Sequence, residues 1–174
     1  TTAIATAFNY SRVNQLNQAL KLLKNVKRYA KSDADSLLLM TSFLGNLTHA
    51  KKYKEAAYYA QEVKQLLDKI PADNFNNRIT AYNFLALHYI ETHNIKLAYQ
   101  YADKYADIAS TINFPTGVRS AEIFYYKLDS IQGNYGSAIK HHLMAQHIKD
   151  SIDNVTKAYQ VSLLHIENDT EKKN

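Results

Sequence analysis

The sequence predicts an all-α protein built from consecutive helical hairpins, and three observations lead to this expectation. Only 4 glycines and 2 prolines occur in 174 residues, so turns are few and the segments between them are long. Alanine and tyrosine alternate at helical spacing over most of the chain. One alanine recurs at nearly regular intervals, which indicates a repeated unit. A single hairpin cannot bury both of its apolar faces, so repeated hairpins have to stack.

The stretch 81–109 carries the clearest hairpin pattern. Leu85, Ala86 and Tyr89 fall on one side of a first helix. The second helix has a stripe at steps of four, three and four residues, formed by Ala98, Ala102, Tyr105 and Ala109. Small residues beside large rings let two helices approach closely, because each ring fills the space next to an alanine. We therefore expect two helices joined by a short turn.

Similar hairpins are expected over 3–30, 37–67 and 118–149. One alanine marks the second helix of each hairpin: Ala19, Ala56, Ala98 and Ala138. The intervals between these marker alanines are 37, 42 and 40 residues. Extra residues fall in turn-forming segments around Pro71 and Pro115. Because proline lacks the N–H that a helix interior needs, each proline is expected to separate two hairpins.

A separate C-terminal element is expected over 150–174, after a repeat array over 1–149. Asp150 is suited to cap a new helix. An apolar stripe follows at steps of three, four, four and three residues, formed by Ile152, Val155, Tyr159, Leu163 and Ile166. We expect this helix to cover the exposed end of the last hairpin, as a capping helix does in a helical-repeat array.

The hairpin at 81–109 resembles one tetratricopeptide (TPR) unit, whose pattern is W-x2-L-G-x2-Y followed by A-x3-F. The matching positions, from the Trp position to the Phe position, are occupied by Tyr82, Leu85, Ala86, Tyr89, Ala98 and Ala102. The resemblance implies a right-handed α-α superhelix, a TPR-like solenoid of about four hairpins plus a C-terminal capping helix. It also implies a non-catalytic role in binding a protein or peptide, because TPR arrays hold extended peptides on the concave face that their first helices line.

The concave-face positions of TPR units, carried over to this chain, give a set of candidate binding residues. They belong to the first helix of each hairpin and are Phe8, Arg12, Asn46, His49, Asn83, Leu87, Ile90, Ile123 and Lys127. Asparagine can hydrogen-bond a peptide backbone, and arginine or lysine can pair with a carboxylate. The resemblance therefore implies a protein or peptide partner. The alternative interpretation is that these are ordinary exposed helix residues.

A second resemblance lies in the C-terminal run SAIKHHLMAQHIKDSIDNVTKAYQVSLLHIENDTEKKN. This run is similar to the end of the TPR region in Bacteroidetes sensor histidine kinases and TPR-containing transcriptional regulators. The resemblance implies the sensory region of a bacterial signal-transduction protein, placed in the periplasm, with a membrane helix and an output module further along the chain. The alternative is a free-standing scaffold or adaptor that assembles protein complexes in the cytoplasm.

Charge and composition argue against direct nucleic-acid binding and against a membrane span. The net charge is +5 and the pI about 9.2, but the 21 basic residues are dispersed among 16 acidic ones. The densest basic stripe fits the solvated face of one helix and consists of Lys21, Lys24, Lys27, Arg28 and Lys31. No DNA- or RNA-reading motif is present. No apolar run reaches the roughly 18 residues that cross a bilayer.

No catalytic, cofactor or metal site is expected. The chain has no cysteine and no glycine-rich phosphate loop. The histidine pairs His88 with His93 and His142 with His147 are each five residues apart. A zinc pair on a helix needs a spacing of four residues, as in H-E-x-x-H. An enzyme that uses these histidines is the third alternative, beside the sensor and the scaffold.

Overall fold

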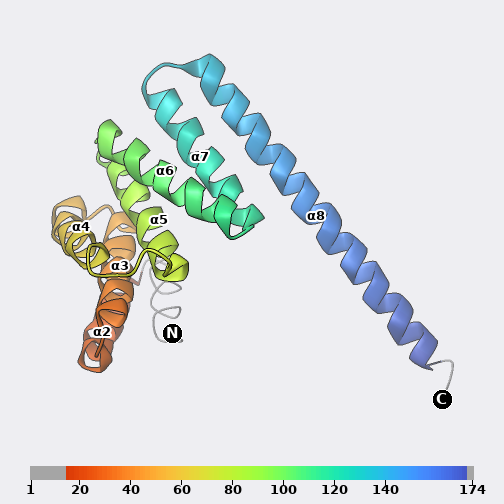
Figure 1. Ribbon diagram of the computed structural model, residues 1–174, viewed down its shortest axis with the longest axis horizontal. Helices are drawn as coiled ribbons and strands as arrows, with labels where there is room; N and C mark the ends of the chain where they lie inside the picture. The colour runs from red at the N-terminus through yellow and green to blue at the C-terminus, as the bar shows by residue number, and fades with distance from the viewer. Residues whose placement is uncertain (1–14, 172–174) are drawn as a thin grey trace.

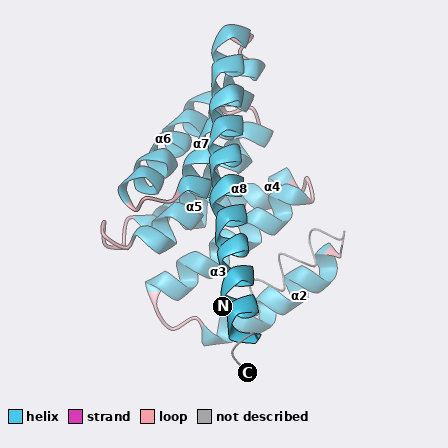
Figure 2. Ribbon diagram, turned by 90° about the vertical axis from the view of Figure 1, so that its right-hand side faces the viewer, coloured by secondary structure: helices cyan, strands magenta, loops and turns pink. Residues whose placement is uncertain are grey.

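The computed structural model describes residues 15–171, with side chains as far as residue 165, and all regular elements in this part are helices (Figure 2). They are α2 (Leu16–Val26), a short 3-10 turn η1 (Lys27–Tyr29), α3 (Asp33–His49), α4 (Tyr53–Leu67), α5 (Phe75–Glu91), α6 (Ile95–Thr111), α7 (Pro115–Ile131) and α8 (Tyr135–Glu171). The expected all-α class is confirmed. The expected first helix of the hairpin at 3–30 lies outside the described residues.

Consecutive helices pair as hairpins along the chain (Figure 1). Helix α3 packs against α4, α5 against α6, and α7 against α8. Neighbouring hairpins contact each other through their first helices, α3 with α5 and α5 with α7, and also through α4 with α5 and α6 with α7. Helix α2 packs against α3 at the N-terminal end. The hairpins expected over 37–67, 81–109 and 118–149 are therefore present.

The marker alanines occupy one structural position. Each is the fourth residue of its helix, in α2, α4, α6 and α8 respectively, and each is at most 2% exposed: Ala19, Ala56, Ala98 and Ala138. A methyl group at this position lets the facing helix approach closely. The tyrosines then fill the remaining space, as where the Tyr89 and Tyr101 rings stack with centroids 5.7 Å apart. The sequence repeat is thus also a repeat of packing.

The short connections between helices share one backbone form. Those at 50–52, 92–94, 112–114 and 132–134 each have three residues, and the middle residue has a positive φ of 58° at Lys51, 57° at His93, 50° at Asn113 and 78° at Gly133. In each case the last two backbone N–H groups of the connection donate hydrogen bonds to carbonyls at the end of the preceding helix. For example, the Asn94 N–H donates to the Tyr89 carbonyl at 2.9 Å. Helices joined in this way turn back on themselves, which produces the hairpin.

Helix α8 differs from the expected C-terminal element. It runs uninterrupted from Tyr135 to Glu171, 37 residues, which corresponds to about 55 Å. The helix start that the sequence suggested at Asp150 is therefore wrong. Its carboxylate instead accepts a hydrogen bond from the Gln146 side chain one turn earlier, at 2.8 Å. No glycine or proline follows Gly136, so nothing in the backbone interrupts the helix.

Only the first half of α8 packs on the hairpins. Ala138 and Ala145 are buried against the body, whereas residues 154–165 are all exposed. Figure 1 shows this second half running away from the other helices. Val155, Tyr159 and Leu163 are 69%, 65% and 41% exposed, so the stripe expected to cover the end of the last hairpin does not do so.

Candidate functional site

A hollow of about 280 Å³ lies where the C-terminal ends of α3, α5 and α7 meet. Three of the candidate binding residues, one from each helix, line it: His49, Leu87 and Lys127. The other lining residues are Thr48, Lys51, Tyr53 and Glu91. The structure therefore brings together side chains that are about 40 residues apart along the chain, from three successive first helices.

A second hollow of about 310 Å³ adjoins the first, because Glu91 and Lys127 line both. Its walls are largely apolar and include Ile90, Tyr126 and Ile131. We call the two hollows together the first-helix groove. One part of this groove is polar and the other apolar, so it offers two kinds of contact side by side.

The groove follows from helical periodicity in equivalent helices. On α5, Asn83, Leu87 and Glu91 are four residues apart and share one face. On α7 the equivalent positions, the ninth, thirteenth and seventeenth of the helix, are Ile123, Lys127 and Ile131. Because α5 contacts α7, the two rows lie on neighbouring helices. The result is a surface that repeats from one hairpin to the next.

Glu91 forms the polar contacts that join the walls of the groove. Its Oε1 lies 3.9 Å from Lys127 Nζ, and its Oε2 accepts a hydrogen bond from the Tyr53 hydroxyl at 3.3 Å. Burial, together with the negative charge of Glu91, raises the pKa of Tyr53, so this hydroxyl stays a donor. The Lys127 and Glu91 side chains are 41% and 37% exposed. An exposed pair of this kind contributes about 1 kcal/mol or less, so a charged ligand group can displace it.

The remaining candidate residues lie in different environments or outside the described part of the chain. Asn83 and Ile123 are half-buried on the faces described above, one turn before the hollows. Ile90 is only 3% exposed, so it belongs to the core and contributes just one edge of a wall. Phe8 and Arg12 lie outside the described residues.

Asn46 was wrongly expected on an exposed face. It is 0% exposed, and its Nδ2 donates to the Ser42 carbonyl at 2.7 Å within α3. All residues from 41 to 48 are buried, because α3 is packed against α2, α4 and α5. Asn46 therefore contributes to the interior rather than to the groove.

Eight groove residues were missed in the sequence: Thr48, Lys51, Tyr53, Glu91, His93, Tyr126, Ser130 and Ile131. A signal for two of them was present. Glu91 and Ile131 each follow a candidate residue, Leu87 and Lys127, by one helical turn, and so share its face. Tyr53 and Tyr126 carry no such signal, since their place depends on how the helices cross.

The described part of the chain contains no group of three or more His, Cys, Asp or Glu side chains placed to hold a metal ion. Within the same residues, no helix combines the length and apolar character that crossing a membrane requires. Comparison with protein-family models, with curated proteins and with solved structures finds no match to this chain. The functional argument therefore proceeds from the geometry of the hairpins and of the groove.

Proposed function

We propose that this protein is a TPR-like solenoid, a right-handed superhelix of hairpins, that binds an extended segment of another protein in the first-helix groove without catalysing a reaction. The observation that carries the proposal is the pair of equivalent rows on α5 and α7, with His49 at the matching last position of α3. An extended peptide has a regular backbone repeat, and a surface that repeats from hairpin to hairpin suits such a ligand.

The lining of the groove specifies the chemistry of the segment. Lys127 and Lys51 attract a carboxylate, and His49 supplies a further hydrogen-bonding group. The adjoining apolar wall, with Tyr126 and Ile131, suits an aliphatic or aromatic side chain. We therefore infer a peptide with an acidic residue close to an apolar one.

The biological role that we propose is the sensory or interaction region of a bacterial signal-transduction protein in the periplasm. Helix α8 supports this role because it is packed on α7 at one end and extends about 55 Å as one continuous helix. A ligand between α5 and α7 would signal through α8 if two arrangements of these helices bind it with different affinities. A cytoplasmic scaffold or adaptor is the second candidate, because binding alone does not require such coupling.

The full-length gene distinguishes these two roles. A membrane helix with a histidine-kinase or DNA-binding module encoded after Asn174 supports the sensor. A stop codon directly after Asn174 contradicts it and leaves the scaffold.

Binding in the groove is tested by selecting peptides from a random linear library with the whole protein. The Kd of a selected peptide is then measured for the wild type, for Leu87→Ala/Lys127→Ala and for the control Leu66→Ala/Lys54→Ala. The control removes the same two residue types from α4, a second helix. We expect the groove variant to bind at least about tenfold more weakly, since hot-spot truncations cost more than about 1 kcal/mol. Equal losses in both variants would mean that the groove is not the binding surface.

A further inference from the structure

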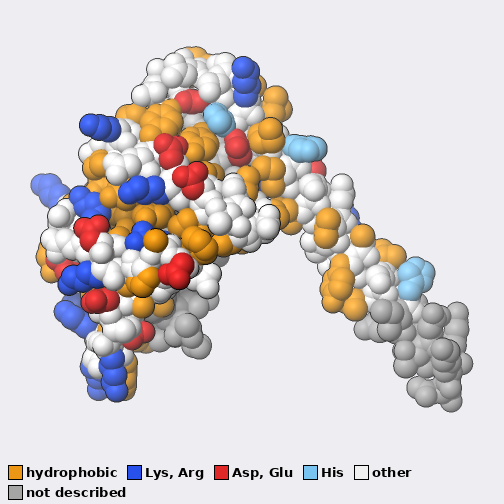
Figure 3. Space-filling view, viewed as in Figure 1, with side chains coloured by type: hydrophobic (Ala, Val, Ile, Leu, Met, Phe, Trp, Pro, Cys, Tyr) orange, Lys and Arg blue, Asp and Glu red, His pale blue; other side chains and the backbone are white. Residues whose placement is uncertain are grey.

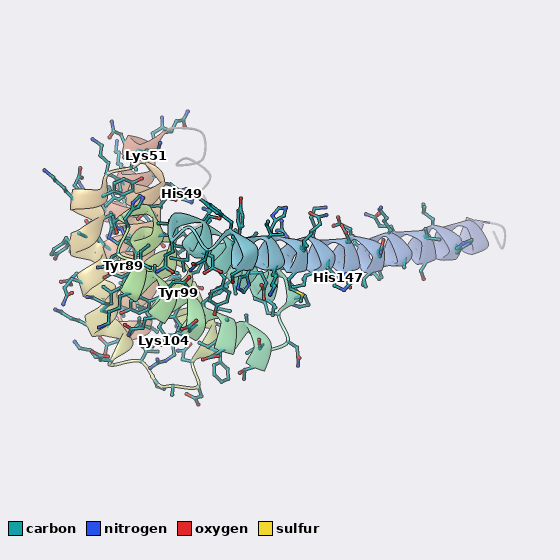
Figure 4. The ribbon with its side chains drawn as sticks, turned by 90° about the horizontal axis from the view of Figure 1, so that it is seen from above. His49, Lys51, Tyr89, Tyr99, Lys104 and His147 are labelled. Atoms are coloured by element: carbon teal, nitrogen blue, oxygen red, sulfur yellow. The ribbon has the colours of Figure 1, made fainter. Side chains whose placement is uncertain are left out.

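A hollow of about 530 Å³ lies between α4, α5 and α6, apart from the first-helix groove. Basic side chains from all three helices surround it: Lys64 of α4, Arg78 of α5 and Lys104 of α6. Figure 4 shows Lys104 and the groove residue His49 toward opposite sides of the hairpin array. We call this region the basic hollow.

The basic hollow arises where the repeat is irregular. The connection between α4 and α5 covers residues 68–74, seven residues, in place of the three residues found at the other turns from α3 onward. Helix α4 accordingly contacts α5 less extensively than α6 contacts α7. The wider spacing leaves a space that the second helices do not close.

Arg78 is fixed at the edge of this space by neutral acceptors. Its guanidinium donates from Nε to the Pro71 carbonyl at 2.9 Å, and from Nη2 to the carbonyls of Ile70 at 2.6 Å and Leu67 at 3.1 Å. Its Nη1 donates to the Tyr82 hydroxyl at 2.8 Å. These bonds hold the long connection against α5. None of them neutralises the positive charge, since every acceptor is uncharged.

The two lysines also keep their charge available. Lys104 Nζ lies 5.6 Å and 5.5 Å from the ring centroids of Tyr82 and Tyr101, within cation–π distance of both rings. In the described part of the chain, no carboxylate lies within the 4.0 Å ion-pair distance of Lys64, Arg78 or Lys104. Figure 3 shows several basic side chains, with apolar side chains between them, over the part of the surface where α4 lies.

The balance of groups in the hollow favours an anion. Asp68 is its one carboxylate against three cations, which leaves a formal charge of +2. The hydroxyl of Tyr101 remains protonated, because burial and the neighbouring tyrosines raise its pKa to about 12. Three glutamine side chains at the rim add further hydrogen-bond donors. Donors and positive charge therefore converge in one hollow, beside two buried tyrosine rings.

We propose that the basic hollow binds a small organic anion carrying at least two carboxylate or phosphate groups. Two anionic groups match the charge of +2, and the volume falls within the roughly 300–1,000 Å³ range of small-molecule sites. One of its anionic groups meets Lys104, which is held beside the rings of Tyr82 and Tyr101. A bound anion would also join Lys64 to Lys104, and so fix the α3–α4 hairpin relative to α5–α6. This is a binding activity beyond the peptide groove and does not depend on it.

The proposal is tested by isothermal titration of the whole protein, without peptide, using pyrophosphate, citrate and the neutral control glycerol. The variant Lys64→Gln/Lys104→Gln removes two charges from the hollow, and Lys140→Gln/Lys157→Gln removes two charges from exposed positions of α8. Far-UV circular dichroism checks that both variants are folded. We expect saturable binding of pyrophosphate, citrate or both. The hollow variant should raise the Kd at least about tenfold, whereas the α8 variant should leave it within about twofold.

The outcomes distinguish a phosphate ligand from a carboxylate ligand, and they include the results that would contradict the proposal. Binding of pyrophosphate alone assigns phosphate, binding of citrate alone assigns carboxylate, and binding of both assigns the shared charge. Absence of saturable heat with both anions, or equal binding of glycerol, overturns the proposal. So does an equal loss in the two lysine variants, because the probe would then respond only to the net charge of +5.

Discussion

Replacing Ala56 by leucine tests whether the marker alanines are points of close helix approach. Ala56 is 0% exposed and is the fourth residue of α4, which packs against α3. Leucine adds three carbons at a site closed to solvent, and such overpacking costs about 1–3 kcal/mol. The next residue, Ala57, is exposed on the same helix, so Ala57→Leu is a matched control. Alanine and leucine have similar helix propensities, so the control should change stability by less than about 0.5 kcal/mol.

The difference in stability between Ala56→Leu and Ala57→Leu is measured by urea unfolding, followed by far-UV circular dichroism, and by the melting temperature. For a chain of this size about 1 kcal/mol corresponds to roughly 2–4 °C, so Ala56→Leu should lower the Tm by about 2–12 °C. The urea slope should stay constant, because the surface exposed on unfolding is unchanged. If Ala56→Leu and Ala57→Leu unfold at the same urea concentration, the marker alanine is not a close-contact site, and the packing repeat loses its physical basis.

Two further predictions concern the turns and a buried histidine. His93 has a φ of 57°, a region costly for residues with a side chain, so His93→Gly should stabilise the protein by about 0.5–1 kcal/mol. The reverse change at an equivalent turn, Gly133→Ala, should destabilise it, and urea midpoints that move the other way would contradict this account. Burial lowers the pKa of His88 below 6.5, so the unfolded state takes up the proton more readily and stability rises as the pH increases toward neutrality. The urea midpoint should thus be lower at about pH 5.5 than at about pH 7.5, and His88→Gln should reduce the difference, whereas an undiminished difference would assign it to other groups.

The hairpins were predictable because their signal is local and repeated. Ala56, Ala98 and Ala138 mark the same position in three helices, and spacing alone reveals such a regularity. The continuity of α8 was not predictable in the same way. Asp150 is a good helix cap in isolation, but a cap acts only where the preceding helix has a reason to end. The absence of glycine and proline after Gly136 was the stronger signal.

The groove was only partly predictable, because polar residues in α3 point inward. Thr41, Ser42, Asn46 and Thr48 are all buried, against the usual preference of such residues for the surface. Some satisfy their hydrogen bonds within their own helix, as the Ser42 hydroxyl does by donating to the Leu38 carbonyl at 2.7 Å. Bonds of this kind need no partner elsewhere in the chain, so no pattern in the sequence distinguishes a buried asparagine from an exposed one.

The two candidate surfaces arise from opposite properties of the chain. The first-helix groove is a consequence of regularity, since equivalent turns place Leu87 and Lys127 at the same position on neighbouring helices. The basic hollow is a consequence of irregularity, because the longer connection at 68–74 leaves room that Arg78 borders without filling. A search for repeats therefore finds the groove and passes over the hollow. It follows that substitutions of Lys64 and Lys104 should leave the groove unaltered, since neither residue lines it, and the two binding activities can be tested separately in one protein.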